Sequence, residues 1–184
     1  MDSINKNQPE KNHEDLQSNE AIAKIKDLVE SAGSCFFCTD AVNDRRSHSS
    51  ESSGACPMAV KKVDDQGNLW FLSASDSHKN KEININPSVK LFFQGSAHSD
   101  FLFINGDATI STDPVRIKEL WEPILKTWFT EGIDDPRITV IKVTPREGYY
   151  WDTKHGHAVA GIKMLIGAAI GKTLDDSIEG KLAI

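Results

Sequence analysis

Short apolar runs, each bounded by turn-forming residues, recur through the middle of the chain and predict β-strands. Glycine, asparagine, aspartate and serine gather between the runs and predict reversals at 64–68 and 95–99. Because the strands are joined mostly by tight turns, the pattern favours an antiparallel barrel over a parallel α/β sheet. The predicted strands are 35–39, 55–63, 69–74, 89–93, 100–112 and 137–144, with a short one at 149–151.

Apolar residues at helical spacing predict helices at the edges of this strand region. One helix is expected over 19–32 and is ended by Gly33. Another begins at Pro114, and its apolar face extends to Trp128, which predicts that this indole packs in the core. Pro123 is expected to bend that helix because proline cannot continue the hydrogen-bond ladder.

The length of 184 residues fits one well-buried domain. Residues 1–18 are polar with almost nothing to bury, so they are expected to form a disordered tail. The barrel domain is assigned to 19–155. Residues 156–184 are weakly apolar and then acidic, and they are expected to form a C-terminal tail that packs on the barrel or on a partner.

Composition narrows the possible partners and the compartment. A formal net charge of −6 argues against a nucleic-acid surface, because such binding depends on clustered cations. No long apolar run predicts a membrane span, and the first residues lack the apolar segment of a secretory signal. Three cysteines fit a reducing compartment, so the expected location is the cytoplasm.

The most informative stretch combines a strand, hydroxyl groups, a lysine and the start of a short helix over 77–85. The apolar strand from residue 69 leads directly into Ser73, Ser75, Ser77 and Lys79. Unpaired N–H groups at a helix N-terminus carry partial positive charge, and hydroxyls plus an ammonium complete the coordination of a phosphate. Ordinary helix capping explains the same serines, and spacing alone does not decide between the two.

Two cysteine and histidine motifs suggest metal chemistry, but neither predicts a metal site. Cys35 and Cys38 lie three apart on a predicted strand, so their side chains point to opposite faces and are interpreted as small apolar residues. His155 and His157 lack carboxylate or cysteine companions at ligand spacing. His78 beside the predicted anion site faces either a ligand or water.

A family resemblance rests on a series of short motifs in order. They are Cys35-Phe36-Phe37-Cys38-Thr39, Pro57-Met58-Ala59, Leu69-Trp70-Phe71, the serines with His78-Lys79, Gly106-Asp107-Ala108, Lys118-Glu119-Leu120-Trp121, Trp128-Phe129, Val143-Thr144-Pro145 and Tyr150-Trp151-Asp152. In this order and spacing, the chain resembles the general stress protein 26 group of the pyridoxamine 5′-phosphate oxidase-like, flavin-binding split-barrel superfamily. The resemblance covers about residue 21 to the C-terminus.

The resemblance implies a mainly β fold with peripheral helices: a six-stranded antiparallel Greek-key split barrel that forms a homodimer. It also implies that FMN is held in two equivalent grooves at the subunit interface, with FAD as an alternative. Ser73, Ser75, Ser77 and Lys79 would hold the ribityl chain and its phosphate. The backbone of Met58 and Ala59 would face the flavin ring, and Gln94 and Trp151 would approach it, in one alternative from the partner chain.

Two departures from the family pattern qualify the function. The family usually has an arginine before the Pro-Met pair, and this chain has Cys56, which predicts weaker anion binding and makes a cofactor-free protein an alternative. Arg45 or Arg46 in the loop 40–54 is a candidate substitute. The acidic C-terminal segment would repel a phosphorylated substrate, so this is not expected to be a true pyridoxamine 5′-phosphate oxidase.

Two classes of function remain open on the sequence. The first is an FMN-dependent oxidoreductase of unknown substrate, and no catalytic acid or base is evident near the expected ring position. The second is a general stress protein that binds flavin or buffers redox state without turnover. By the same resemblance, haem or a deazaflavin is a further alternative to the flavin.

Overall fold

A computed structural model of the chain describes residues 12–39, 54–97, 99–156, 160, 162–163, 165–166 and 176–184. The strands are β1 (Leu16–Gln17), β2 (Ser34–Thr39), β3 (Ala55–Ala59), β4 (Lys62–Val63), β5 (Leu69–Ala74), β6 (Ser88–Gln94), β7 (Phe101–Ser111), β8 (Ile138–Thr153) and β9 (Ser177–Ala183). The helices are α1 (Ser18–Ala32), α2 (His78–Ile85) and α3 (Pro114–Leu120), with 3-10 helices η1 (Pro123–Thr127) and η2 (Gly132–Asp134).

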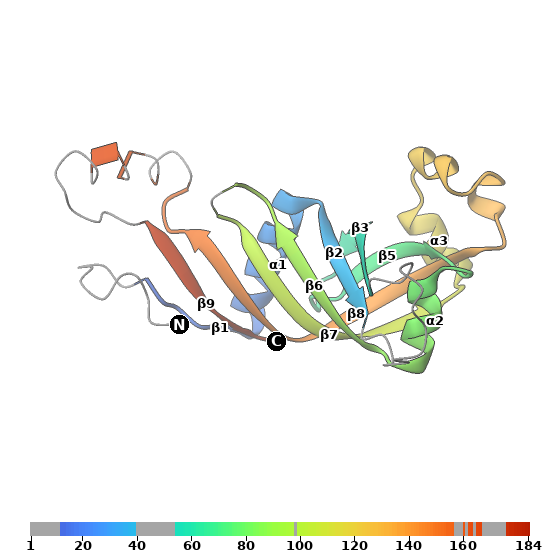
Figure 1. Cartoon of the computed structure of the whole chain (residues 1–184), viewed down its shortest axis with the longest axis horizontal. Coiled ribbons are helices and arrows are strands. Elements are labelled where there is room, and N and C mark those ends of the chain that lie inside the picture. Colours follow the sequence, from blue (N-terminus) through green and yellow to red (C-terminus); the bar gives the residue numbers. More distant parts are fainter. Residues whose placement is uncertain are drawn as a thin grey trace.

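The strands form one curled sheet in the order β1-β9-β8-β7-β6-β2-β3. The chain passes from β3 into β4, which pairs with β5, and β5 pairs with the first half of β8. The sheet therefore turns back on itself, as expected for a split barrel. In Figure 1, β1 and β9 lie at one end of the molecule, and α2 and α3 lie at the other.

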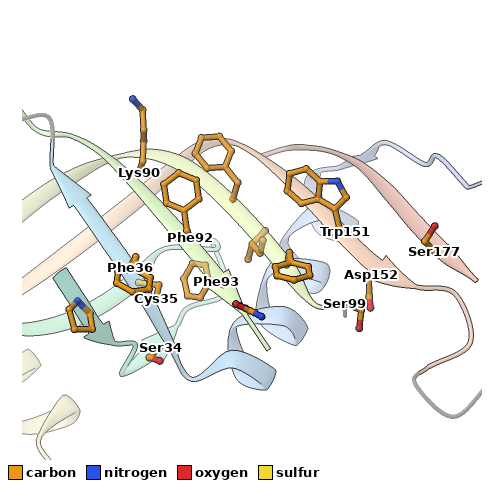
Figure 2. Close-up of a pocket in the computed structure, with 15 residues that line it drawn as sticks. Ser34, Cys35, Phe36, Lys90, Phe92, Phe93, Ser99, Trp151, Asp152 and Ser177 are labelled. Carbon is orange, nitrogen blue, oxygen red and sulfur yellow. The ribbon is translucent and has the colours of Figure 1, made fainter. Parts of the chain in front are cut away.

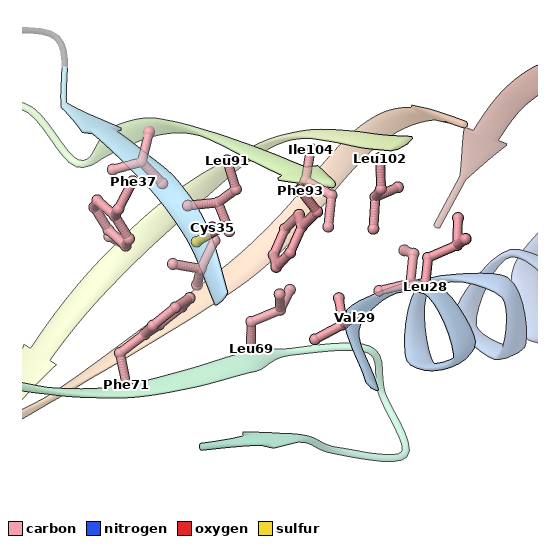
Figure 3. Close-up of a cluster of buried hydrophobic side chains, with 14 of the residues drawn as sticks. Leu28, Val29, Cys35, Phe37, Leu69, Phe71, Leu91, Phe93, Leu102 and Ile104 are labelled. Carbon is pink, nitrogen blue, oxygen red and sulfur yellow. The ribbon is translucent and has the colours of Figure 1, made fainter. Parts of the chain in front are cut away.

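The main core fills the space between this sheet, β5 and α1. Figure 3 shows Phe37 and Leu91 on one side, Phe71 opposite them, and Leu28 and Val29 reaching in from α1. The rings of Phe37 and Phe71 meet edge to face with centroids 5.4 Å apart, a favoured aromatic geometry. The helix α1 ends at Gly33, which adopts the left-handed conformation with φ 66°, so the predicted boundary is confirmed.

The predicted long helix after residue 114 is interrupted at its proline. The helix α3 ends at Leu120, and a separate 3-10 helix begins at Pro123, because the residue before a proline is driven out of the helical conformation. Leu120 and Phe129 still pack in a second apolar cluster. Trp128 loses its place on the apolar face and is 63% exposed, so its predicted core position is wrong.

The described residues form nine strands, whereas the sequence predicts a six-stranded barrel. The predicted strands 137–144 and 149–151 belong to one strand, because β8 continues through residues 145–148 as a single sixteen-residue strand. The pairing of β7 with β8 shifts register between Asn105 and Gly106, at the point where Gly106 pairs with Pro145. A side chain on Gly106 would come within 2.6 Å of the Thr144 carbonyl oxygen, so the two backbones approach closely at this glycine.

Both ends of the chain add strands to the sheet, which sequence patterning did not predict. The short β1 pairs in parallel with β9, although it lies within the segment expected to be disordered. The Tyr150 hydroxyl donates to the Glu14 carbonyl at 2.9 Å, which fixes this segment on β8. Residues 1–11 of the expected tail lie outside the described residues, as do 40–53 and the arginines at 45 and 46.

The start of β9 is anchored by the buried carboxylate of Asp176. Its Oδ1 accepts from Lys163 Nζ at 2.7 Å and lies 2.7 Å from His155 Nδ1. Burial raises the pKa of this carboxyl, but the hydrogen bonds from Lys163 and His155 outweigh burial and hold the pKa at about 2. Charge-assisted hydrogen bonds therefore tie the start of β9 to His155 and Lys163.

No helix among the described residues has both the length and the apolar character needed to cross a membrane.

We predict that Gly180→Ala detaches residues 12–17 from β9. A Cβ atom at this position would lie 1.8 Å from the Glu14 carbonyl oxygen, so the two segments must separate. The hydrogen bond from Glu14 N to the Glu179 carbonyl at 2.9 Å would be lost. We expect faster amide exchange at residues 14–17 and a loss of roughly 1–3 kcal/mol in the free energy of unfolding.

Lys181→Ala is the control, because it truncates an exposed neighbouring side chain and keeps the backbone pairing. Unchanged amide protection in the Gly180→Ala variant would contradict the close contact between the two segments.

Candidate functional site

Cross-strand register places a row of aromatic side chains on the outer face of the sheet. Pro57 pairs with Phe36, Phe36 with Phe92, Phe92 with Phe103, and Phe103 with Tyr149. The rings of Phe92 and Phe103 lie 5.1 Å apart. Phe36 is 60% exposed and Phe92 is 47% exposed. We call Pro57 and the four aromatic residues Phe36, Phe92, Phe103 and Tyr149 the aromatic row.

A second row beside it contains two of the predicted cofactor residues. Gln94 pairs with Phe101, and Phe101 pairs with Trp151. Trp151 is 44% exposed, and its ring lies 4.6 Å from that of Tyr149 in the aromatic row. The Gln94 amide donates to the Ser96 carbonyl at 3.0 Å, which orients it along the turn that follows β6.

These rows line an open groove of about 1070 Å³. Figure 2 shows the rings of Phe92 and Trp151 rising from the strands and Ser99 and Asp152 near one end. Asp152 accepts from Lys24 at 2.9 Å, so its charge is balanced by α1. The groove lining consists of Ser34, Cys35, Phe36, Pro57, Lys90, Phe92, Phe93, Gln94, Ser99, Phe101, Leu102, Phe103, Trp151, Asp152 and Ser177.

The hydroxyl and lysine residues form a separate cluster where β5 leads into α2. Lys79 Nζ donates to Ser73 Oγ at 3.2 Å, and the hydroxyls of Ser73 and Ser77 are 3.3 Å apart. Ser77 caps α2 by accepting from the Asn80 amide at 3.3 Å. We call Ser73, Ser77 and Lys79 the hydroxyl–lysine corner, because they join two hydroxyls, one ammonium and a helix N-terminus.

Ser75 does not join this corner. The strand β5 ends at Ala74, so the period-two alternation that would place the Ser75 side chain on the same face as Ser73 does not continue. Ser73 is buried, Ser75 is exposed, and the Ser75 amide donates to the Arg137 carbonyl at 2.8 Å. His78 also lies on the exposed surface.

Cys56 packs against the main core from β3, and its thiol interacts electrostatically with Lys79. Burial raises the pKa of the Cys56 thiol, with Lys79 lowering it and Glu82 raising it. The thiol is therefore neutral at physiological pH and adds no charge to the corner. Cys35 is buried and Cys38 is half-buried, and all three cysteines are free thiols, so the prediction of small apolar cysteines fits this strand.

Among the described residues, β3 is the last strand on its side of the sheet order, so one of its edges has no partner strand there. Val60 N donates to the Gly33 carbonyl at 3.1 Å. The antiparallel alternation then turns the backbone of Met58 toward β2 and that of Ala59 toward the open edge. The Met58 side chain packs on the core, so Ala59 is the better placed of the two predicted backbone ligands.

The predicted residues therefore fall into three groups: Ser73, Ser77 and Lys79 at the corner, Met58 and Ala59 on β3, and Gln94 and Trp151 in the groove. Thr139 of β8 pairs with Ser73 at the corner, and Trp151 lies twelve residues further along the same strand. At about 3.3 Å per residue this separation corresponds to about 40 Å of strand. Measured along the strand, this separation exceeds the length of one small ligand.

The aromatic row was not predicted as part of the site. Phe36 and Phe92 were recognised only as strand formers, because both faces of these runs are apolar and period-two patterning could not separate core from surface. The signal was present, since an antiparallel strand with one solvated face normally alternates apolar and polar residues. In β2 and β6 the outer face carries exposed aromatic residues as well.

Comparisons with known proteins bear on this arrangement. The family model described as "Pyridoxamine 5'-phosphate oxidase like" matches residues 20–175. Among curated proteins, Protein bli-3 of Neurospora crassa is 28% identical over 102 residues, which are 50% of this chain and 49% of the relative. The chain therefore matches about half the length of that relative.

Solved structures share the fold. A protein described as general stress protein 26 from Jannaschia sp. CCS1 superposes with a TM-score of 0.71 at 20% identity, covering 88% of this chain and 97% of that one. The general stress FMN/FAD binding protein from Xanthomonas citri superposes with a TM-score of 0.57 at 23% identity, covering 70% and 85%.

Proposed function

The chain belongs to the pyridoxamine 5′-phosphate oxidase-like family, and from this premise we propose that it binds FMN in a site completed by a second copy of itself. The observation that carries the proposal is the hydroxyl–lysine corner beside the open edge of β3. One structural neighbour is named as an FMN/FAD binding protein, which supports a flavin as the ligand.

The residues at the corner suit a terminal phosphate. Lys79 supplies a full positive charge, Ser73 supplies a hydroxyl, and the N-terminus of α2 adds partial positive charge. The neutral thiol of Cys56 adds no repulsion there. FMN ends in a phosphate, whereas FAD carries an adenylate beyond it, so the compact corner favours FMN.

The edge of β3 connects the corner to an apolar surface of the kind a flavin ring requires. Cys56 approaches Lys79, and its neighbour Pro57 lines the groove on the other face of the strand. A ligand crossing this edge would meet the backbone of Ala59, which is turned outward. Planar aromatic groups gain from such contact through area burial and ring stacking.

Bound FMN would supply reversible transfer of a hydride or of single electrons, and the protein would supply binding and orientation. Lys79 and Ser73 would hold the phosphate, and the outward backbone of Ala59 would orient the ring edge. The aromatic row would exclude water from the ring. We assign the protein as a flavin-dependent oxidoreductase of the general stress protein group, without a true pyridoxamine phosphate oxidase activity.

A second copy of the chain is the proposed cover for the aromatic row. Phe36, Phe92 and Trp151 form an exposed apolar face on a curved sheet, and faces of this kind mark interaction sites. A two-fold interface would bring the far end of one sheet over the corner of the other. Gln94 and Trp151 of the partner could then contact a flavin that Lys79 of the first chain holds.

We predict that the purified protein binds FMN and that Lys79→Ala weakens this binding by roughly ten- to a hundredfold. Removing one charge-assisted hydrogen bond to a phosphate costs about 1.5–3 kcal/mol. Quenching of flavin fluorescence on titration measures the dissociation constants. Lys81→Ala on the exposed face of the same helix is the matched control and should bind as the parent does.

Equal affinities of the Lys79→Ala and parent proteins would contradict the phosphate assignment. Assay of the FMN-loaded protein with NADH and NADPH separates the two roles. An oxidoreductase oxidises at least one of them faster than free FMN does, whereas a flavin carrier does not.

We predict that Phe92→Glu converts a dimer into a monomer. A buried carboxylate in the aromatic row would lack a partner across the interface, so the two copies would separate. Light scattering coupled to size-exclusion chromatography gives the mass directly. Trp128→Glu is the control, because this indole is exposed and lies outside both the aromatic row and the groove lining, and that variant should remain dimeric. A monomeric parent protein, or a dimeric Phe92→Glu variant, would refute this interface.

A further inference from the structure

A buried polar network lies directly beneath the hydroxyl–lysine corner. The side-chain amide of Asn80 donates to Thr139 Oγ1 at 2.8 Å, and the Thr139 hydroxyl donates to the Ser73 backbone carbonyl at 2.8 Å. Asn80 is 2% exposed, Thr139 is 3% exposed and Ser73 is 4% exposed. Three elements meet here, because Asn80 belongs to α2, Thr139 to β8 and Ser73 to β5.

The hydrogen bonds of this network run in one direction. Ser77 donates its single proton to Asn80 Oδ1 at 3.2 Å, so the Ser77 oxygen acts as an acceptor toward its other neighbours. It accepts from the Asn80 backbone amide and, at 3.3 Å, from the Ser73 hydroxyl. Lys79 then donates one of its three protons to the Ser73 oxygen.

This direction has a consequence for ligand binding. Ser77 is fixed as the helix cap and has no proton for a ligand, whereas Ser73 can turn its proton outward. Lys79 retains two further protons. Ser73 and Lys79 are therefore the groups of the corner that can donate to a ligand. Asn80 holds the Ser77 hydroxyl in place, and Thr139 holds the Ser73 backbone.

Resting on the proposed function, we propose that Asn80 and Thr139 are positioning residues that make this site select ligands ending in phosphate. Neither touches the ligand. Asn80 fixes the oxygen of Ser77, and Thr139 fixes both the Asn80 amide and the Ser73 backbone. Without the Thr139 hydroxyl, the Asn80 amide loses its partner and the two serine hydroxyls lose their common orientation.

A purely structural role for the network predicts a different result from a positioning role. General loosening of the fold would weaken every ligand alike. A positioning role weakens only those ligands whose phosphate contacts Ser73 and Lys79. FMN and riboflavin form the discriminating pair of probes, because they share the ring and ribityl chain and differ in the phosphate.

The test uses the full chain with Thr139→Val, which preserves side-chain shape and removes the hydroxyl, and with Thr139→Ser, which restores it. We expect Thr139→Val to weaken FMN binding about tenfold and to change riboflavin binding less than twofold. Thr139→Ser should recover the parental ratio of the two dissociation constants. If Thr139→Val does not fold, Asn80→Ala is measured in the same way and carries the same expectation.

An unchanged ratio of the two constants in the Thr139→Val protein would overturn the inference, as would an equal loss for both ligands. If the parent protein binds neither flavin, the proposed function fails, and inorganic phosphate replaces the flavins as the probe. A rise in melting temperature with phosphate in the parent and Thr139→Ser proteins, absent in Thr139→Val, supports the positioning role. If phosphate changes the melting temperature of the Thr139→Val protein as much as that of the other two proteins, the positioning role is overturned.

Discussion

The long strand β8 is the constraint on which the other parts of the structure depend. Its first half pairs with β5 and β7 and its second half with β7 and β9, so one strand belongs to both ends of the barrel. It passes the proline at 145 without breaking, because Gly106 allows the backbones to approach and the register to shift. Thr139 at one end and Trp151 at the other are thereby fixed at the two halves of the candidate site.

Local patterns in the sequence were sufficient for elements whose causes are local. The helix α1, its glycine end, the hairpin before β5 and the capped start of α2 were all predictable from spacing and capping chemistry. Pairings between distant segments were not. The contact of β1 with β9 depends on a glycine at 180 that leaves room for the Glu14 backbone, and nothing in either segment alone indicates the other. The break at Pro123 was visible in the sequence, but its extent depends on the packing of Phe129.

The candidate site likewise contains one part that local sequence predicts and another part that depends on pairing between distant segments. The hydroxyl–lysine corner was predictable because its donors lie within seven residues of each other in sequence. The exception, Ser75, failed because the strand ended one residue earlier than the alternation required. The aromatic row comes from separate strands brought together by register, and the supporting Thr139 lies 59 residues beyond Asn80. Such groups have no spacing rule that a single sequence could reveal.

The account depends on two copies sharing one ligand, with the phosphate held by one chain and the ring approached by the other. A mixed dimer tests this directly: a Lys79→Ala chain and a Trp151→Ala chain are given different tags, co-expressed and purified as the heterodimer, and titrated with FMN. A shared site predicts that the heterodimer has one binding site of parental affinity, since one groove then contains both an intact Lys79 and an intact Trp151. If the heterodimer has no site of parental affinity, although the parent dimer does, then Trp151 does not act across the interface and the account is contradicted.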